Sequence, residues 1–83
     1  MQEEVTDREM MKNDKIISAI DIAKKFNVSY QTVNHYTDLG LLRVSKRKGN
    51  GRLYRESEVK SRLKRIDELK NEGYPLRIIR NII

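Results

Sequence analysis

Residues 28–36 have the sequence VSYQTVNHY, and LGLL at residues 39–42 follows them, before a strongly basic segment. Ser29 is a favourable helix N-cap and Gly40 a favourable residue just after a helix, so the pattern predicts a helix over Tyr30–Asp38. Val33 and Tyr36 lie three residues apart and should face the core. The stretch therefore predicts a short, capped helix with one apolar face.

The opposite face of this helix is polar but has few charges. It carries amides, an imidazole and a phenol from Tyr30, Gln31, Asn34 and His35, and a carboxylate from Asp38. Amide, imidazole and hydroxyl groups suit hydrogen bonds to base edges and phosphates, so we predict that this helix contacts DNA. His35 is the only histidine and there is no cysteine, which favours a contact or packing role over a metal-ligand role.

A second helix is predicted immediately upstream. Ser18 and Asp21 have the spacing of a capping box, which predicts a helix over Ala19–Phe26. Ile20, Ala23 and Phe26 are expected to face inward. Asn27 tolerates the left-handed conformation of a tight helix exit. The two segments together predict a helix, a tight turn and a helix.

A basic β-hairpin is predicted downstream. Residues 41–44 and 52–55 have the character of short strands, residues 46–51 are predicted as the loop, and Asn50-Gly51 is a strong turn signal. Leu42, Leu53 and Tyr54 should pack on the helices. Residues 43–55 contain six bases and no acid, namely Arg43, Lys46, Arg47, Lys48, Arg52 and Arg55. Such a hairpin, or wing, is suited to contact phosphates beside a recognition helix.

The remaining sequence predicts a second helix pair. The first of these helices begins near Glu56 and ends at Gly73, and its apolar stripe is formed by Val59, Leu63, Ile66 and either Leu69 or Lys70. Pro75 is expected to open the last helix. The side chains of Leu76, Ile79, Ile82 and Ile83 are expected on one side of it. The predicted fold is mainly α: a winged helix-turn-helix with a two-stranded β-hairpin wing and a second helix pair.

Composition limits the class of protein. The chain has 83 residues, enough for one small domain, and a net charge of +6. Residues 1–14 are polar and acidic and are predicted to form a flexible tail, whereas residues 16–83 hold fifteen bases and seven acids, a net charge of +8. This balance favours a polyanionic partner. The absence of cysteine excludes disulfides and thiolate zinc sites, and no cofactor is expected.

The acidic residues are scattered and no pair suggests acid–base catalysis, so the chain is not expected to be an enzyme. Gly49 and Gly51 lack the strand–loop–helix context of a phosphate-binding loop. No apolar run is long enough to cross a membrane, and we expect a soluble protein of the cytoplasm, associated with the nucleoid.

The order of these motifs resembles the N-terminal winged-helix DNA-binding domain of the MerR family of transcription regulators. The resemblance covers residues 16–83. It lies in IDIAKKFNVS at residues 20–29, TV at 32–33, HY at 35–36, LGLL at 39–42, RLY at 52–54, Val59, GYPL at 73–76 and Ile79. It implies a domain at residues 15–83 that binds double-stranded DNA. It also implies that the full-length protein is a homodimer on palindromic operators, and that RNA polymerase is an indirect partner through a distorted promoter.

By position, the resemblance places Gln31, Asn34 and His35 among the recognition-helix contacts and Arg52 at the wing arginine that reaches the backbone. Arg43 and residues 46–48 fall on the first half of the wing, and Tyr36 on the helix packing face, where its hydroxyl can touch a phosphate. The complete set of expected DNA-binding residues is Ser29, Tyr30, Gln31, Asn34, His35, Tyr36, Arg43, Lys46, Arg47, Lys48, Arg52 and Tyr54.

Three residues depart from the family pattern. Asn34 stands where the family usually has arginine, Gly51 where it has an aromatic residue, and Thr37 where it has glutamate. Arginine pairs with guanine, whereas an amide pairs with adenine. We therefore expect an operator that differs from the common family type, with adenine opposite Asn34.

Two alternatives remain open. An excisionase-like or architectural DNA-bending factor would share this chemistry but bind clustered direct repeats. A winged helix that binds an acidic protein would be indifferent to DNA sequence. Regulators of this family normally continue into a dimerisation helix and an effector domain, so we expect this chain to be a fragment that is monomeric by itself.

Overall fold

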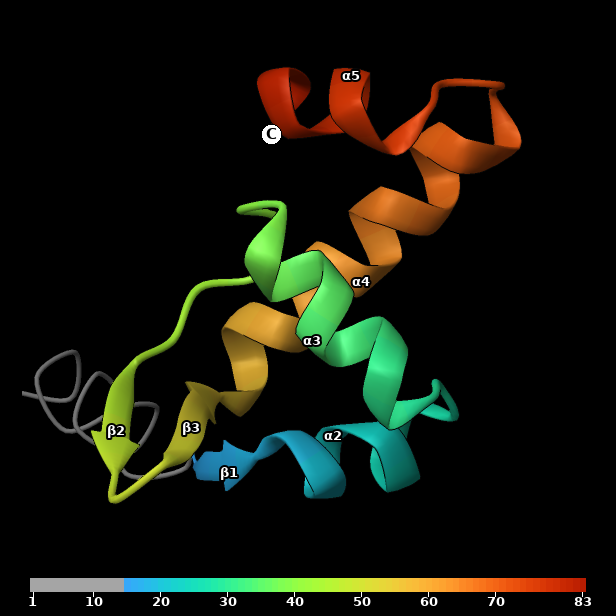
Figure 1. Cartoon of the computed structure of the whole chain (residues 1–83). Coiled ribbons are helices and arrows are strands. Elements are labelled where there is room, and N and C mark those ends of the chain that lie inside the picture. The colour runs from blue at the N-terminus through green and yellow to red at the C-terminus, as the bar shows by residue number, and fades with distance from the viewer. Residues whose placement is uncertain (1–14) are drawn as a thin grey trace, which may run out of the picture.

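The computed structural model describes residues 15–83, so the predictions for residues 1–14 lie outside the described residues. The elements in chain order are β1 (Ile16–Ser18), α2 (Ala19–Phe26), α3 (Tyr30–Asp38), β2 (Lys46–Lys48), β3 (Gly51–Arg55), α4 (Glu56–Asn71) and α5 (Leu76–Ile82). In Figure 1, α3 crosses in front of α4, the sheet and α2 lie at one end, and α5 lies at the other end. The predicted class is confirmed: the fold is mainly helical with a small antiparallel sheet.

Helix α2 begins with the predicted capping box. The Ser18 hydroxyl oxygen accepts a hydrogen bond from the Asp21 amide at 3.2 Å, and the Ser18 amide donates to the Asp21 carboxylate at 3.5 Å. The helix ends at Asn27, whose φ of 56° is left-handed as predicted. The prediction that Ile20 faces inward was wrong, because its side chain is 54% exposed. The buried stripe starts instead with Ala19 and continues three residues later with Ile22, which has no exposed surface, and four residues further with Phe26, which packs against the core.

Helix α3 has the predicted bounds and caps. The Ser29 hydroxyl oxygen accepts a hydrogen bond from the Thr32 amide at 2.9 Å, which satisfies one of the free amides of the first turn. Val33 and Tyr36 are buried, as predicted. At the other end Gly40 has a φ of 84°, a conformation that costs a residue with a Cβ atom about 1–2 kcal/mol. The chain then turns back and the Leu41 amide donates to the Tyr36 carbonyl at 2.8 Å.

The sheet differs from the prediction in three ways. Residues 41–44 do not form a strand; the first hairpin strand is β2, at Lys46–Lys48. The two-residue turn is Gly49-Asn50 and not Asn50-Gly51, because Lys48 pairs with Gly51. Gly49 has a φ of 61°, as expected for a hairpin turn with glycine in the first central position. In addition, β1 pairs antiparallel with the other edge of β3, so the sheet has three strands in the order β1-β3-β2.

One hydrophobic core joins all four described helices to the sheet. Its members are Ala19, Ile22, Val33, Tyr36, Leu41, Leu42, Tyr54, Val59, Leu63, Ile66, Leu69 and Ile79. The apolar stripe of α4 is confirmed, with Leu69 as its last member. On α5 only Ile79 is fully buried, and Ile82 is 43% exposed, so the predicted apolar side of this helix is narrower than expected. Among residues 15–83 there is no helix long and apolar enough to cross a membrane.

Candidate nucleic-acid interface

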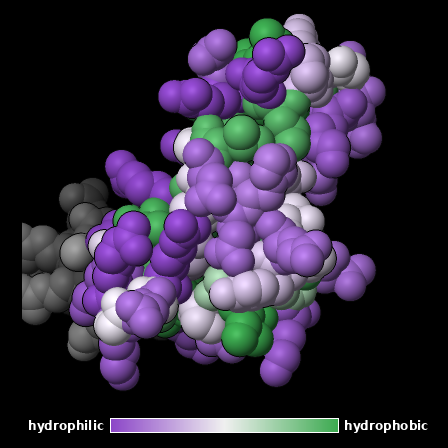
Figure 2. All heavy atoms as spheres, in the orientation of Figure 1, coloured by the Kyte–Doolittle hydropathy of each residue, from purple (hydrophilic) through white to green (hydrophobic). Residues whose placement is uncertain are grey.

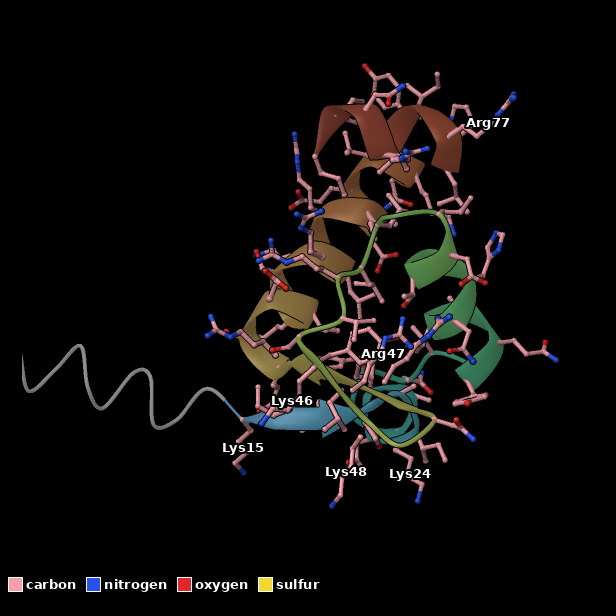
Figure 3. The ribbon with its side chains drawn as sticks, turned by 60° about the vertical axis from the view of Figure 1, so that its left-hand side comes forward. Lys15, Lys24, Lys46, Arg47, Lys48 and Arg77 are labelled. Carbon is pink, nitrogen blue, oxygen red and sulfur yellow. The ribbon has the colours of Figure 1, made fainter. Side chains whose placement is uncertain are left out.

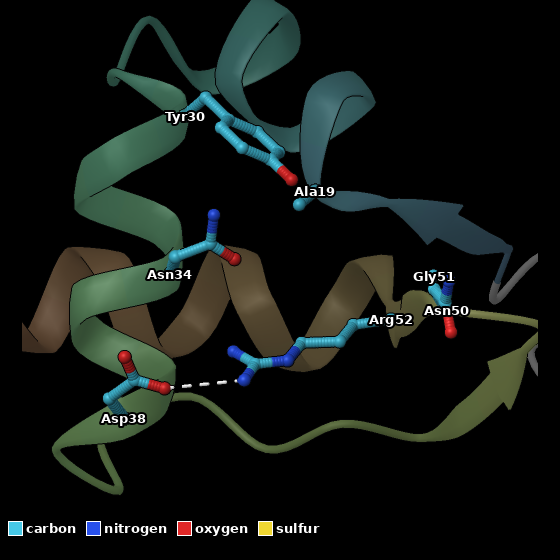
Figure 4. A pocket seen from close by; sticks show the side chains of 7 residues that line it. All are labelled: Ala19, Tyr30, Asn34, Asp38, Asn50, Gly51 and Arg52. Carbon is cyan, nitrogen blue, oxygen red and sulfur yellow. Dashed lines mark hydrogen bonds and ion pairs between the residues drawn. The ribbon is translucent and has the colours of Figure 1, made fainter.

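Helix α3 and the β2–β3 hairpin face each other across a groove of about 360 Å³. Figure 4 shows α3 on one side of it and the hairpin on the other. The residues that line it are Ala19, Tyr30, Asn34, Asp38, Asn50, Gly51 and Arg52. The groove therefore lies between the two elements that the sequence predicts to contact DNA.

The α3 side of the groove is built by helix periodicity. Tyr30, Asn34 and Asp38 recur every four residues, so they lie above one another on one face of the helix. Gln31 and His35 are also four residues apart. Measured from the centre of the Tyr30–Asn34–Asp38 face, they lie about 60° or more further round the helix, and both are exposed to solvent. Asn34 is half-buried beside the hairpin. The polar surface of α3 is thus divided between the groove and an outer face.

The hairpin side of the groove is built by strand register. Arg47 lies directly opposite Arg52, so both side chains are on the same face of the sheet. That face is the one next to α3, since Arg52 contacts Asp38. Lys46 and Lys48 lie on the opposite face. Figure 3 shows Lys48 extending from the same end of the molecule as Lys24, in the last turn of α2.

Arg52 and Asp38 connect the hairpin to α3. Nη2 of Arg52 lies 3.3 Å from Oδ1 of Asp38, and the side chains are 30% and 65% exposed. The other terminal nitrogen, Nη1, is enclosed and has no hydrogen-bond partner within residues 15–83. The pKa of Arg52 is raised above its usual range, chiefly by its side-chain hydrogen bond to Tyr54, with a smaller contribution from Asp38 that desolvation opposes. The guanidinium therefore stays charged but is only partly paired.

A second connection runs beneath this pair, from Tyr54 of β3 to Thr37 of α3. Their hydroxyl oxygens are 2.7 Å apart, and Thr37 also donates to the Val33 carbonyl at 2.8 Å. A threonine hydroxyl has a single proton, so Thr37 must accept from Tyr54. The Tyr54 oxygen is consequently free to accept a hydrogen bond from Arg52. Thr37 thus gives a neutral link between α3 and the hairpin.

Of the predicted contact residues, Tyr30, Asn34 and Arg52 line the groove, whereas Tyr36, Tyr54 and Arg43 do not. Tyr54 has no exposed surface and Tyr36 is 7% exposed, so both are core residues and their rings cannot lie against DNA in this conformation. Arg43 precedes β2, and its Nη2 pairs with Oε2 of Glu58 on α4 at 2.9 Å, away from the groove. Ser29 is exposed, but its oxygen is engaged in the cap of α3.

Sequence reasoning did not assign Asp38 or Asn50 to the site. Asp38 has a recognisable signal, because it continues the four-residue spacing of Tyr30 and Asn34 along α3. Asn50 enters the groove because it belongs to the turn, and that placement depends on the hairpin register. No group of three or more potential metal-ligating side chains occurs among the residues that the structure describes.

The surface around the hairpin is predominantly hydrophilic. Figure 2 shows this in one view, with hydrophobic areas mainly between α5 and the end of α3 and at α2. The exposed Ile20 belongs to α2. Polar and basic groups around a groove between a helix and a hairpin suit the backbone of a nucleic acid better than an apolar ligand.

Comparison with known proteins decides the family. A family model described as MerR HTH family regulatory protein matches residues 18–83. This chain belongs to the MerR family. The predicted resemblance is therefore confirmed over nearly the whole of its expected range, and with it DNA-binding transcription regulation in a family that is not enzymatic. Searches of curated proteins and of solved structures gave no significant match.

Proposed function

We propose that this domain binds a specific double-stranded DNA operator, with α3 in the major groove and the β2–β3 hairpin on the adjacent phosphate backbone. The observation that carries the proposal is the position of two arginines of an acid-free hairpin, Arg47 and Arg52, on the side that faces α3. A helix in the major groove and cations on the flanking backbone are the two components of duplex binding by winged helices.

Base selection is assigned to the outer and groove-facing polar side chains of α3. Gln31 and His35 are exposed, and Asn34 lies at the edge of the groove. An asparagine amide matches the N6 and N7 groups of adenine, and a good bidentate pair discriminates by about 1–3 kcal/mol. We therefore propose adenine opposite Asn34, in an operator unlike that of relatives with arginine at this position.

Selection of bound duplexes from a random library tests the base contacts. Wild type should enrich one sequence, and Asn34→Ala should lose the preference at one base pair while keeping it at the others. Equal weakening at every position would refute the assignment of Asn34. Failure of the wild type to enrich any sequence, while it binds an acidic protein, would favour the protein-interaction alternative.

The hairpin arginines are proposed to contact phosphates. Arg47→Ala should weaken binding to all duplexes alike and lower the slope of log affinity against log salt by about one unit. Lys64→Ala is a matched control, since this exposed cation lies on α4 and outside the groove. An equal effect of the two substitutions would refute a specific backbone contact by the hairpin.

We further propose that the full regulator binds as a homodimer, and that RNA polymerase is affected through the DNA. Two copies related by twofold symmetry would insert their α3 helices about 34–36 Å apart, or a multiple of this, on a palindrome. Sequences enriched by the full-length regulator should then contain inverted repeats. Clustered direct repeats would support the excisionase-like alternative instead.

A further inference from the structure

We propose that Asp38 competes with the DNA backbone for Arg52 and so limits sequence-independent binding. This inference rests on the proposed function, since it assumes that the groove between α3 and the hairpin receives a phosphate strand. Asp38 is not among the predicted DNA-binding residues. It weakens DNA binding, whereas the predicted contacts strengthen it.

The charges in the groove oppose each other. Among the residues that line it, Arg52 carries the positive charge and Asp38 the negative charge. Figure 4 shows the two side chains meeting across the groove. A phosphate that enters this space must share Arg52 with the carboxylate or displace it. In either case a like charge remains beside the phosphate, which opposes binding.

Asp38 contributes little to the fold. It occupies the last turn of α3, where the helix dipole disfavours a carboxylate. In the pair with Arg52, the Asp38 side chain is mostly exposed to solvent. The two side chains make one contact of 3.3 Å, which is longer than a strong charge-assisted hydrogen bond. Exposed pairs of this kind contribute about 0–1 kcal/mol. Stability therefore does not explain why an acid occupies this position.

The arrangement of the cations gives Asp38 a role in the free protein. Arg47 and Arg52 are cross-strand neighbours, and like charges directly opposite each other repel. Asp38 offsets that repulsion in the free protein through a single interaction with Arg52. Nη1 of Arg52 is still without a hydrogen-bond partner in residues 15–83. The guanidinium also interacts with Tyr54, which lies in the core, so Asp38 is the weak, exposed partner that a phosphate can replace.

The test compares Asp38→Asn with Asp67→Asn, which makes the same change of charge on an exposed residue of α4 that lies outside the groove. Binding to a mixed-sequence duplex of about 24 base pairs would be measured by fluorescence anisotropy over a range of salt concentrations. Asp38→Asn should tighten binding about 3- to 10-fold and steepen the salt slope by up to about 0.9. Asp67→Asn should have a clearly smaller effect.

A double-mutant cycle assigns the effect to Arg52. In an Arg52→Ala background, Asp38→Asn should lose most of its gain, because no guanidinium remains to be released. A gain of the same size in both backgrounds would overturn the competition and leave a general charge effect. Equal gains from Asp38→Asn and Asp67→Asn would overturn it as well.

A measurement without DNA separates this inference from the proposed function. The side-chain Nε–H resonance of Arg52 should shift with Asp38→Asn and not with Asp67→Asn. An unchanged resonance in Asp38→Asn would overturn the competition and leave the proposed function standing. Were the wild type to bind no duplex, the proposed function and the competition would both fail, whatever the resonance shows. Wild-type binding combined with a loss of affinity in Asp38→Asn would overturn the competition alone.

Discussion

The two hydroxyls that join α3 to β3 should contribute unequally to stability, because the proton between them has only one possible direction. Thr37 directs its proton to the Val33 carbonyl, so Tyr54 is the donor in the 2.7 Å contact between their oxygens. Tyr54 has no exposed surface and Thr37 is half-buried. Removing the donor and removing the acceptor therefore leave different groups without a partner.

Tyr54→Phe removes the donor and leaves Thr37 hydrogen-bonded to the Val33 carbonyl. Its cost should be close to that of the one net hydrogen bond to Thr37, about 0.5–1.5 kcal/mol, because the partly exposed Arg52 keeps its contact with Asp38. Thr37→Val preserves the shape of the side chain but leaves the buried Tyr54 hydroxyl without an acceptor, which costs about 1–3 kcal/mol. In the double variant no hydroxyl donor is left without a partner. Its loss should therefore be smaller than the sum of the two single losses, and no larger than that of Thr37→Val.

Urea unfolding followed by circular dichroism measures these differences, provided that the slope m is the same for all variants. For a domain of this size each 1 kcal/mol corresponds to about 4–8 °C in Tm. Tyr74→Phe is the matched control, since Tyr74 is 41% exposed and its change should fall within about 0.5 kcal/mol. A larger loss for Tyr54→Phe than for Thr37→Val, or strictly additive losses in the double variant, would refute the proposed proton direction.

Three further predictions concern the elements that position the site. Ile22→Ala should cost about 2–5 kcal/mol and Ile20→Ala no more than about 0.5 kcal/mol in thermal unfolding, because only Ile22 is buried; similar losses would contradict the observed phase of α2. Ser29→Ala should cost about 0.5–2 kcal/mol through loss of the α3 cap, whereas Ser29→Asp should retain most of the stability. Gly40→Ala should cost about 1–2 kcal/mol from its left-handed φ, and a neutral result would show that the turn after α3 can relax.

The helices could be predicted from the sequence because their start and stop signals are local. Ser18, Ser29 and Asn27 each act on backbone groups within a few residues, and the structure confirms all three caps. The buried face of α2 was predicted wrongly because the helix carries apolar residues on two faces. Which of them is buried depends on what packs against the helix, and here it is the face with Ile22. Local patterns cannot determine that choice.

The sheet was harder to predict because its pairing is long-range and its outer strand is entirely exposed. Residues of β2 are all basic, so no alternation of apolar and polar side chains fixes their register. Strand β1 pairs with residues 53–55, more than thirty positions away, and nothing in Ile16–Ser18 identifies that partner. The contact between Asp38 and Arg52 depends on this register and for the same reason could not be derived from the sequence.

The register of β3 links the core to the proposed interface. Side chains alternate along a strand, so Arg52 must lie on the same face as Tyr54, two residues away. Tyr54 is buried against α3 through Thr37, which directs Arg52 toward α3 as well, and the pairing of β2 then places Arg47 beside it. A slip of one residue would move both arginines to the opposite face and away from α3. Burial of one tyrosine thus determines where the charge of the hairpin lies, and the hydroxyl that anchors the strand also interacts with the guanidinium that Asp38 holds.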